Sequence, residues 1–245
     1  MKKSAKNILE LKGISFQRIG AKILDNITWK IKEGQHWALI GPNGSGKTTL
    51  LKIASGSIWP SRGTVKILGH EIGKKDIRQI RKKIGWVSPY LAERIPKNQE
   101  ILDIIISGKF ASFGVYEKVT GNDIKKAKEL MKFMEISCLD NKTLDLLSEG
   151  EKQKVIIARA LMAEPLILIL DEPCASLDIK SRKNLLSLIS KICNKNSTSI
   201  IYVTHHIEEI MPEIKEAVLL KHGRILKNGP AKNVLKDEVI EKMFE

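Results

Sequence analysis

The chain has 245 residues, enough to bury a hydrophobic core in one large domain or in two closely packed lobes. Its 42 Lys and Arg outnumber its 28 Asp and Glu, which leaves a net charge of +14. No stretch approaches the roughly 18 apolar residues that a membrane helix needs, and the first residues lack the apolar core of a signal peptide. We therefore expect a protein of the cytoplasm.

The first ninety residues are predicted to be mostly strands. Apolar and polar residues alternate with period two in two segments separated by a short turn, which is typical of an antiparallel hairpin. A short apolar strand then runs directly into a glycine-rich loop, and a basic helix at 74–83 precedes the last strand of this region. The predicted strands are 8–17, 22–31, 36–40, 63–68 and 84–88.

Helical periodicity dominates the middle of the chain, and strands and helices alternate again after it. A hairpin across Lys221 to Arg224 and a short helix are predicted at the end. The predicted elements between these parts are helices at 99–110, 122–134 and 149–162, a strand at 166–170, a helix at 180–193 and a strand at 198–204.

This order of elements predicts an α/β fold class, with a parallel sheet, an antiparallel β portion and a helical insertion. We expect a single domain, 1–245, in which a helical subdomain of about 90–162 is inserted in a catalytic core made of 1–89 and 163–245.

The positive charge is mostly lysine and is spread along the chain. Proteins that read nucleic acids typically cluster arginine near aromatic side chains, so we interpret the charge as compositional bias and expect no nucleic-acid partner. Cys138, Cys174 and Cys193 are scattered, which favours small buried side chains over a disulfide framework or a metal site.

Residues 41–48 match the pattern G-x-x-x-x-G-K-[ST], between a predicted strand and a predicted helix. The backbone N–H groups of such a loop wrap phosphates. Lys47 can reach the β- and γ-phosphates of a nucleotide, and the Thr48 hydroxyl can ligate Mg²⁺. The nucleotide contacts expected here are Gly41, Pro42, Asn43, Gly44, Ser45, Gly46, Lys47, Thr48 and Thr49.

Polar side chains follow two of the later apolar strands. Asp171, at the tip of the strand 166–170, is suited to hold Mg²⁺, and Glu172 is suited to deprotonate an attacking water. His205 follows the strand 198–204, where it can donate a hydrogen bond to the γ-phosphate. We expect its neighbour His206 to be exposed.

A second anion site is predicted where Ser148, Glu149 and Gly150 open an amphipathic helix. The first turn of a helix presents unpaired backbone N–H groups and the positive end of the helix dipole. A phosphate loop already exists about a hundred residues earlier, so these residues alone do not say which anion is bound.

The motifs at 41–48, 147–153, 166–173, 175–178 and 203–205 have the order and spacing seen in ABC-type ATPases, and the chain resembles this family over essentially its whole length. Kinases and GTPases share the phosphate loop but not the segments at 147–153 and 175–178. The resemblance implies a P-loop NTPase with a RecA-like core sheet, an antiparallel β portion and a helical subdomain. It also implies ATP and Mg²⁺ as cofactors.

The resemblance further implies that two subunits pack head to tail. Ser148 and Gly150 of one subunit would meet the γ-phosphate held by Lys47 of the other, and Asp178 would cross the same interface. The second subunit would be an identical or a similar cassette.

Four functions remain open from the sequence. The first is the ATPase subunit of a membrane transporter, peripheral on the cytoplasmic face, whose separate permease subunits dock around 90–115. The others are a soluble ATPase of a cytosolic assembly, such as iron–sulfur biogenesis, a regulatory cassette, and a degenerate cassette that binds ATP without cleaving it. Trp29 and Trp37 resemble a subgroup associated with molybdate or related metal uptake, although strand packing is the simpler interpretation.

The chain departs from the family in the segment 148–151, which reads Ser-Glu-Gly-Glu where the family has Ser-Gly-Gly-Gln, and at two further positions. Pro89 stands where many cassettes have a Gln that touches Mg²⁺ and the attacking water, and Ser88, Tyr90 and Glu93 are the alternatives for that role. Arg18 stands where cassettes place an aromatic residue against adenine.

A guanidinium can itself stack on a base, so Arg18 is the predicted contact. Phe16 is the alternative, although its alternation with Ile14 suggests a core residue.

Overall fold

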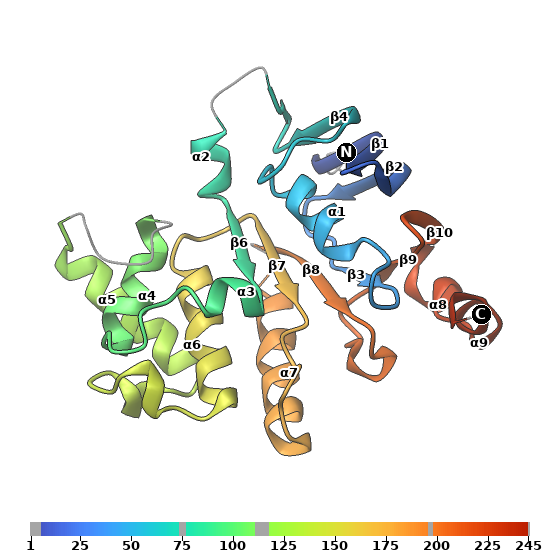
Figure 1. The fold of residues 1–245 in the computed structure, drawn as a ribbon. Coiled ribbons are helices and arrows are strands. Elements are labelled where there is room, and N and C mark those ends of the chain that lie inside the picture. Colours follow the sequence, from blue (N-terminus) through green and yellow to red (C-terminus); the bar gives the residue numbers. More distant parts are fainter. Residues whose placement is uncertain (1–5, 74–76, 111–117, 196–197, 245) are drawn as a thin grey trace, which may run out of the picture.

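The computed structural model describes residues 6–73, 77–110, 118–195 and 198–244 (Figure 1). Two sheets form the framework. The smaller is antiparallel, in the order β2 (Ala21–Lys32), β1 (Asn7–Arg18), β4 (Arg62–Ile67) and β5 (His70–Glu71). The larger has the order β10 (Arg224–Pro230), β9 (Glu216–Lys221), β3 (Trp37–Ile40), β8 (Ser199–Thr204), β7 (Ile167–Asp171) and β6 (Ile84–Val87).

The larger sheet is parallel from β9 to β6, and only β10 runs antiparallel to its neighbour. The parallel strands are mostly apolar in their interiors, because both faces of a parallel sheet are buried. Along β3, Ala38 and Ile40 point to one core and Trp37 and Leu39 to the other. The sheet therefore separates two hydrophobic cores, one shared with the helical region and one shared with the antiparallel sheet.

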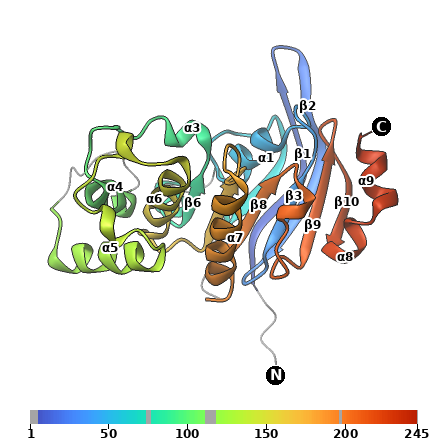
Figure 2. The same ribbon diagram turned by 90° about the horizontal axis from the view of Figure 1, so that it is seen from below.

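The helices gather in three places. α1 (Lys47–Ala54) lies between the two sheets, and α7 (Ile179–Cys193) covers the other face of the parallel sheet (Figure 2). α4, α5 and α6 form one end of the molecule, and α8 and α9 form the other. The bounds are α4 (Ile101–Ser107), α5 (Gly121–Phe133), α6 (Glu149–Leu161), α8 (Ala231–Val234) and α9 (Asp237–Phe244).

Two short helices flank β6, namely α2 (Arg78–Arg81) and α3 (Pro89–Ala92). The remaining helical turns are of the 3₁₀ type, at Gly108–Phe110, Ser137–Leu139, Leu144–Leu146 and Ile207–Glu209. Residues 74–76 of the predicted basic helix lie outside the described residues, and the described part of that segment is helical only in α2. The predicted helix 99–110 ends as α4 at Ser107 and continues as a single 3₁₀ turn.

Polar caps explain where the longer helices begin. Thr120 and Ser148 each form a capping box with the acidic residue three positions later, before α5 and α6 respectively. Asp178 accepts hydrogen bonds from the N–H groups of Lys180 and Ser181 at the start of α7. The sequence therefore sets these helix starts locally.

Trp29 and Trp37 pack edge to face in the core between the sheets, with ring centroids 5.7 Å apart. This agrees with their interpretation as strand packing. Of the three cysteines, Cys174 and Cys193 are buried as predicted, but Cys138 is exposed, because it lies in a 3₁₀ turn that ends the α5 region. Among the described residues, no helix has the length and apolar character needed to cross a bilayer.

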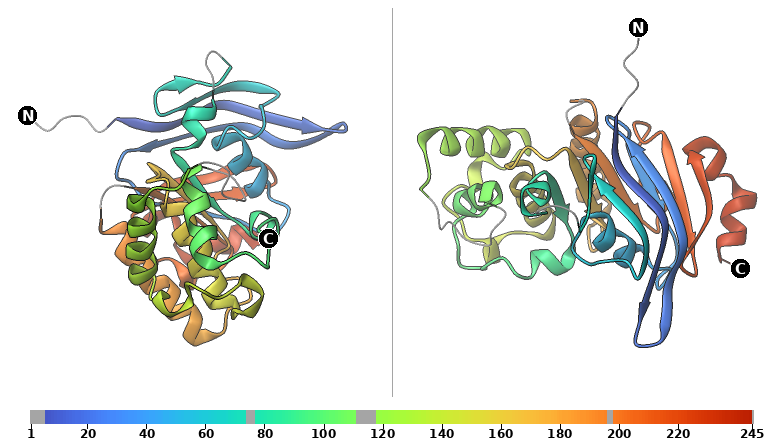
Figure 3. Two further views of the ribbon diagram at one scale, coloured as in Figure 1. Left: turned by 90° about the vertical axis from the view of Figure 1, so that its left-hand side faces the viewer. Right: turned by 90° about the horizontal axis from the view of Figure 1, so that it is seen from above.

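Figure 3 shows the β1–β2 hairpin running past the parallel sheet, with its tip projecting beyond the neighbouring elements. The turn of the second hairpin, β9–β10, contacts both β2 and the loop that follows β3. The Gly223 N–H donates to the carbonyl of Ser45, and the Gly223 carbonyl accepts from the N–H of Asp25. The two hairpins thus hold the loop that follows β3 between them.

Candidate functional site

The loop between β3 and α1 is held in a conformation that glycines make possible. Gly44 and Gly46 have φ values of 78° and 103°, in the region that side chains disfavour. A Cβ at Gly41 would collide with the carbonyl oxygen of Leu220 and lie 2.7 Å from the Ser45 Oγ. Close approach of β9 therefore requires glycine at position 41, and the turn itself requires it at positions 44 and 46.

Lys47 is the first residue of α1 and is 7% exposed. Its Nζ donates to the carbonyl oxygens of Gly41 (2.8 Å) and Pro42 (3.1 Å), so the loop curls around its own ammonium. Nζ also lies 4.0 Å from Glu172 Oε1. Burial lowers the pKa of Lys47, while Glu172 and Asp171 favour its charged form. The ammonium is thus positioned at the mouth of the loop, where a phosphate would enter.

Asp171 is the last residue of β7 and Glu172 follows it, so both lie at the carboxyl end of the parallel strands. Burial, with the neighbouring Glu172 carboxylate, raises the pKa of Asp171 to about 6, and the Lys47 ammonium opposes that rise only in part. Glu172 adopts a positive φ of 51°, and its N–H donates to the carbonyl of Val203. Non-glycine residues in this conformation concentrate at functional sites, because the surrounding structure must compensate for the strain.

His205 follows β8, and its Nδ1 lies 3.2 Å from Glu172 Oε1. Lys47, at the start of α1, and His205, after β8, therefore approach the same carboxylate oxygen from two different elements. His206 pairs instead with Glu208, its side chain 42% exposed. The structure thus brings together Lys47, Asp171, Glu172 and His205, which the sequence places on three separate segments.

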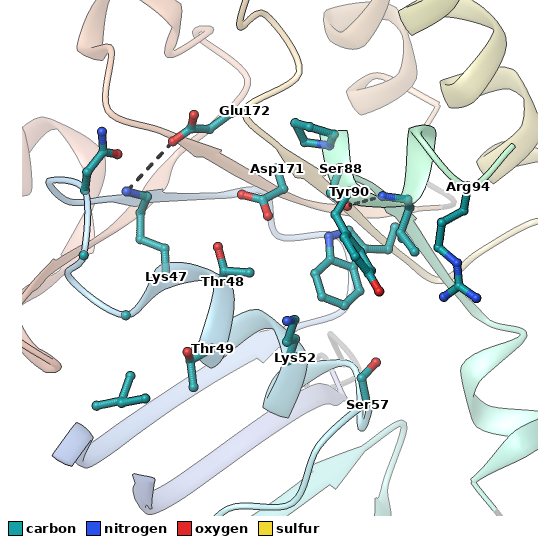
Figure 4. A pocket seen from close by; sticks show the side chains of 17 residues that line it. Lys47, Thr48, Thr49, Lys52, Ser57, Ser88, Tyr90, Arg94, Asp171 and Glu172 are labelled. Carbon is teal, nitrogen blue, oxygen red and sulfur yellow. Dashed lines mark hydrogen bonds and ion pairs between the residues drawn. The ribbon is translucent and has the colours of Figure 1, made fainter. Parts of the chain in front are cut away.

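A cavity of about 960 Å³ opens in front of Lys47, Asp171 and Glu172 (Figure 4), and His205 is not among the residues that line it. Of the predicted nucleotide and metal contacts, those that line it are Asn43, Gly44, Gly46, Lys47, Thr48, Thr49, Asp171 and Glu172. The cavity is also lined by Ser88, Pro89 and Tyr90, which the sequence analysis considered. Sequence reasoning missed the other lining residues, which are Ile23, Lys52, Ser57, Trp86, Leu91 and Arg94. Lys52 could have been predicted, because it lies four residues after Thr48 and therefore on the same face of the helix.

Arg18 does not line this cavity. It is exposed at the end of β1, opposite Ala21 in the hairpin, and Phe16 packs half-buried against the core between the sheets. Ile23 is the hairpin residue that reaches the cavity. The adenine contact of Arg18 stays a prediction, and Ile23 offers an apolar surface that the sequence did not indicate.

Ser148, Gly150 and Asp178 lie apart from the cavity. Ser148 caps α6, where Glu151 Oε2 accepts from both its N–H and its hydroxyl. A Cβ at Gly150 would lie 3.3 Å from the Ser181 side chain, so the first turns of α6 and α7 are neighbours. The second predicted anion site and Asp178 therefore share one face, separate from the phosphate loop of the same chain.

The residues around position 89 are divided between two cavities. Pro89 begins α3, and Ser88 Oγ accepts the N–H of Leu91 at 3.3 Å as its cap. Ser88 and Tyr90 line the phosphate-loop cavity, whereas Glu93 lines a separate cavity of about 360 Å³ beside Gln153 of α6. Among the three alternatives for the missing Gln, Glu93 is thus turned to the other cavity.

The donor set of this site is suited to a metal ion bound together with a nucleotide. Among the described residues, no group of three or more His, Cys, Asp or Glu side chains could hold a metal by itself. Thr48 and Asp171 offer a hydroxyl and a buried carboxylate that is costly to ionise alone. Mg²⁺ commonly takes one or two protein oxygens plus phosphates and waters, so this donor set suits it.

Residues 24–175 match the family model described as ABC transporter. An ABC transporter ATP-binding protein of Bacillus subtilis strain 168, YlmA, is 41% identical over 240 residues, covering 97% of this chain and 91% of that protein. The energy-coupling factor transporter ATP-binding protein EcfA2 of Streptococcus pneumoniae strain D39 is 33% identical over 227 residues, covering 90% of this chain and 79% of that protein.

Solved structures agree with these relatives. The cassette cbiO1 of Clostridium perfringens, part of the ABC transporter complex cbiONQ, has a TM-score of 0.83 at 27% identity and covers 96% of this chain and 93% of its own. A dimeric ATP-binding cassette in a post-hydrolysis state, bound to ADP and Pi, has a TM-score of 0.78 at 27% identity and covers 91% of this chain and 98% of its own.

Proposed function

The chain belongs to the ABC transporter family, and on that premise we propose that it is the subunit that binds and hydrolyses ATP to power a transporter through head-to-tail dimerisation. The observation that carries the proposal is the convergence of Lys47 and His205 on one oxygen of Glu172, at the mouth of the phosphate loop.

Each of these side chains has a role that its position supports. Lys47 binds the β- and γ-phosphates once they replace the loop carbonyls as its partners. Glu172 accepts the proton of the attacking water, and the Val203 carbonyl that receives its N–H holds it at the strand tip. The Nδ1 of His205 faces the Glu172 carboxylate, and we assign its other ring nitrogen to the γ-phosphate; donating to both anions requires that both ring nitrogens carry a proton.

Thr48 and Asp171 are the residues that would hold Mg²⁺, which would neutralise part of the triphosphate charge during hydrolysis. The buried Asp171 carboxylate gains most from such a cation, because burial is what raises its pKa.

Dimerisation explains why the chain carries two anion-binding features that do not face each other. Ser148 is exposed and Gly150 is half-buried at the start of α6, beside the start of α7, where Asp178 lies. In a head-to-tail pair, this face of one subunit closes the phosphate cavity of the other. ATP then holds the two subunits together, and hydrolysis releases them.

The membrane partner is proposed from the relatives. EcfA2 is an ATP-binding protein of an energy-coupling factor transporter, and cbiO1 is part of a transporter complex. By analogy, separate permease subunits dock on this chain, which lies at the cytoplasmic face of the membrane. We place the docking region around 90–115, of which residues 111–115 are outside the described residues.

Affinity capture of a Glu172→Gln variant tests the proposal. The change removes the base but keeps nucleotide binding, so ATP should trap a stable dimer together with its partners. Solubilised membranes and cytosol are captured separately, and bound chains are identified by mass spectrometry. A Lys47→Ala/Glu172→Gln double variant is the matched control, because it loses the phosphate contact.

Recovery of a multi-helix membrane protein, dependent on ATP and on Lys47, is the expected outcome. If only cytosolic proteins are recovered, the transport function is wrong and a cytosolic assembly ATPase takes its place. A variant that stays monomeric with saturating ATP would contradict the head-to-tail dimer.

A further inference from the structure

Ser88 lies where the parallel sheet meets the phosphate site. Val87, the last residue of β6, is opposite Leu170 of β7, so the next residues along the two strands are Ser88 and Asp171. Parallel strands end at the same edge of a sheet, and both residues line the same cavity (Figure 4). Ser88 is only 5% exposed, so its hydroxyl is directed into the structure and not into bulk solvent.

The hydroxyl of Ser88 has hydrogen-bonding capacity left over. A serine hydroxyl offers one donor and two acceptor positions. The N–H of Leu91 uses one acceptor position at 3.3 Å, which holds the side chain in place as the cap of α3. Pro89 has no N–H to compete for the oxygen and favours the first position of a helix. One lone pair and the proton of Ser88 therefore remain for a ligand in the cavity.

The neighbouring side chains are poorer candidates. Tyr90 is 63% exposed and its ring lies 5.8 Å from the Lys52 ammonium, so it belongs to the outer wall of the cavity. Glu93 lines the other cavity. Pro89 offers neither a donor nor a ligand atom.

On the basis of the proposed function, we propose that Ser88 is a further residue of the metal–nucleotide site, accepting a hydrogen bond from a water in the coordination shell of the Mg²⁺ that Thr48 and Asp171 hold. Bound Mg²⁺ keeps several waters, and these waters act as donors because their lone pairs face the metal. Outer-shell partners of this kind typically change metal affinity by about 10–100-fold.

The test measures metal binding without hydrolysis. In the Glu172→Gln background, the affinity of the ATP complex for Mn²⁺ is measured by electron paramagnetic resonance, and ATP affinity is measured separately in EDTA. Ser88→Gly removes the hydroxyl while glycine remains an acceptable cap, and Ser88→Thr keeps the hydroxyl. Ser57→Ala is the matched control, because Ser57 lines the same cavity with its hydroxyl paired to Ser55.

We expect Ser88→Gly to weaken Mn²⁺ binding by about 10-fold or more, with ATP binding in EDTA unchanged, and Ser88→Thr and Ser57→Ala to behave like the parent. Unchanged Mn²⁺ affinity in Ser88→Gly would overturn the proposal. An equal loss of ATP affinity in EDTA would also overturn it, because Ser88 would then act through the shape of the loop. If the parent binds ATP without any dependence on Mn²⁺, the metal site of the proposed function fails instead.

Discussion

Lys47 shows how a single residue combines structural and functional demands. Its ammonium is buried, and two carbonyl oxygens of the loop at residues 41–42 compensate for the lost water. A phosphate that enters the loop offers the same ammonium a negatively charged partner, and charge-assisted hydrogen bonds are the stronger kind. The loop is thus shaped in advance for an anion.

The close packing at Gly41 predicts that even a methyl group there impairs nucleotide binding. A methyl group there would collide with the Leu220 carbonyl and press on Ser45. Gly41→Ala should therefore shift the loop away from β9 and lower ATP affinity at least 10-fold, with some loss of stability. Titration with a fluorescent ATP analogue and thermal unfolding measure the two effects.

The matched control for this change is Gly121→Ala, at the start of α5, where a Cβ meets no atom within 4 Å. This variant should bind ATP like the parent. If Gly41→Ala also binds ATP normally, the close approach of β9 to the loop does not constrain the phosphate site.

Among the secondary-structure elements, α5 begins at an ion pair between Asp123 and Lys109. The Asp123 carboxylate accepts hydrogen bonds from Lys109 Nζ, at 2.7 and 2.8 Å, and from the N–H and hydroxyl of Thr120. Lys109 first, and then Thr120, lower the pKa of Asp123 to about 2. The ionised carboxylate thus ties α5 to the 3₁₀ turn that follows α4.

Asp123→Asn should destabilise the protein in a pH-dependent way. A carboxyl pKa that is lowered in the folded state stabilises the fold above its unfolded pKa of about 4, and this contribution is lost as pH falls toward about 2. The difference in unfolding free energy between parent and variant should therefore be constant from pH 5 to 8 and shrink below about pH 4. Urea denaturation across this range measures it.

Lys109→Met removes the other half of the pair and should reproduce most of the effect of Asp123→Asn, while the double variant should cost little more than either single change. Additive effects of the two substitutions would show that the ion pair does not contribute as a unit.

At the scale of the whole molecule, Ser148 and Gly150 lie apart from the phosphate cavity, and in the proposed dimer they complete the site of a second subunit. This arrangement predicts complementation between two inactive variants. Lys47→Ala disables a phosphate loop, and Gly150→Asp places a negative charge in the face that meets the partner's γ-phosphate. In a mixed head-to-tail dimer, both defects fall in one composite site and the other site is intact.

Each variant alone should be inactive in ATP hydrolysis, and mixing the two should restore a substantial part of the activity. A chain that carries both substitutions, mixed with the Lys47→Ala variant, is the control and should stay inactive, because neither composite site is then intact. If the first mixture is no more active than its components, the subunits do not complete each other's sites.

Much of the fold could be predicted from the sequence, because its signals are local. The capping residues Thr120, Ser148 and Asp178 mark helix starts with side chains that bond the backbone a few residues away. The short elements α3 and β5 were missed. They have four and two residues, too few to show a period, and contacts with the rest of the chain stabilise them.

The sequence by itself determined the phosphate loop, the carboxylates at the end of β7 and the histidine after β8. Each of these motifs consists of consecutive residues, so it is recognised without any knowledge of tertiary contacts. It also determined the family, through the order of these segments. Only the tertiary structure decided that Lys47 and His205 meet at Glu172, that Ile23 and not Arg18 lines the cavity, and that Ser88 and Glu93 face different cavities. Those outcomes depend on strand register and on packing between distant segments, which local composition does not encode.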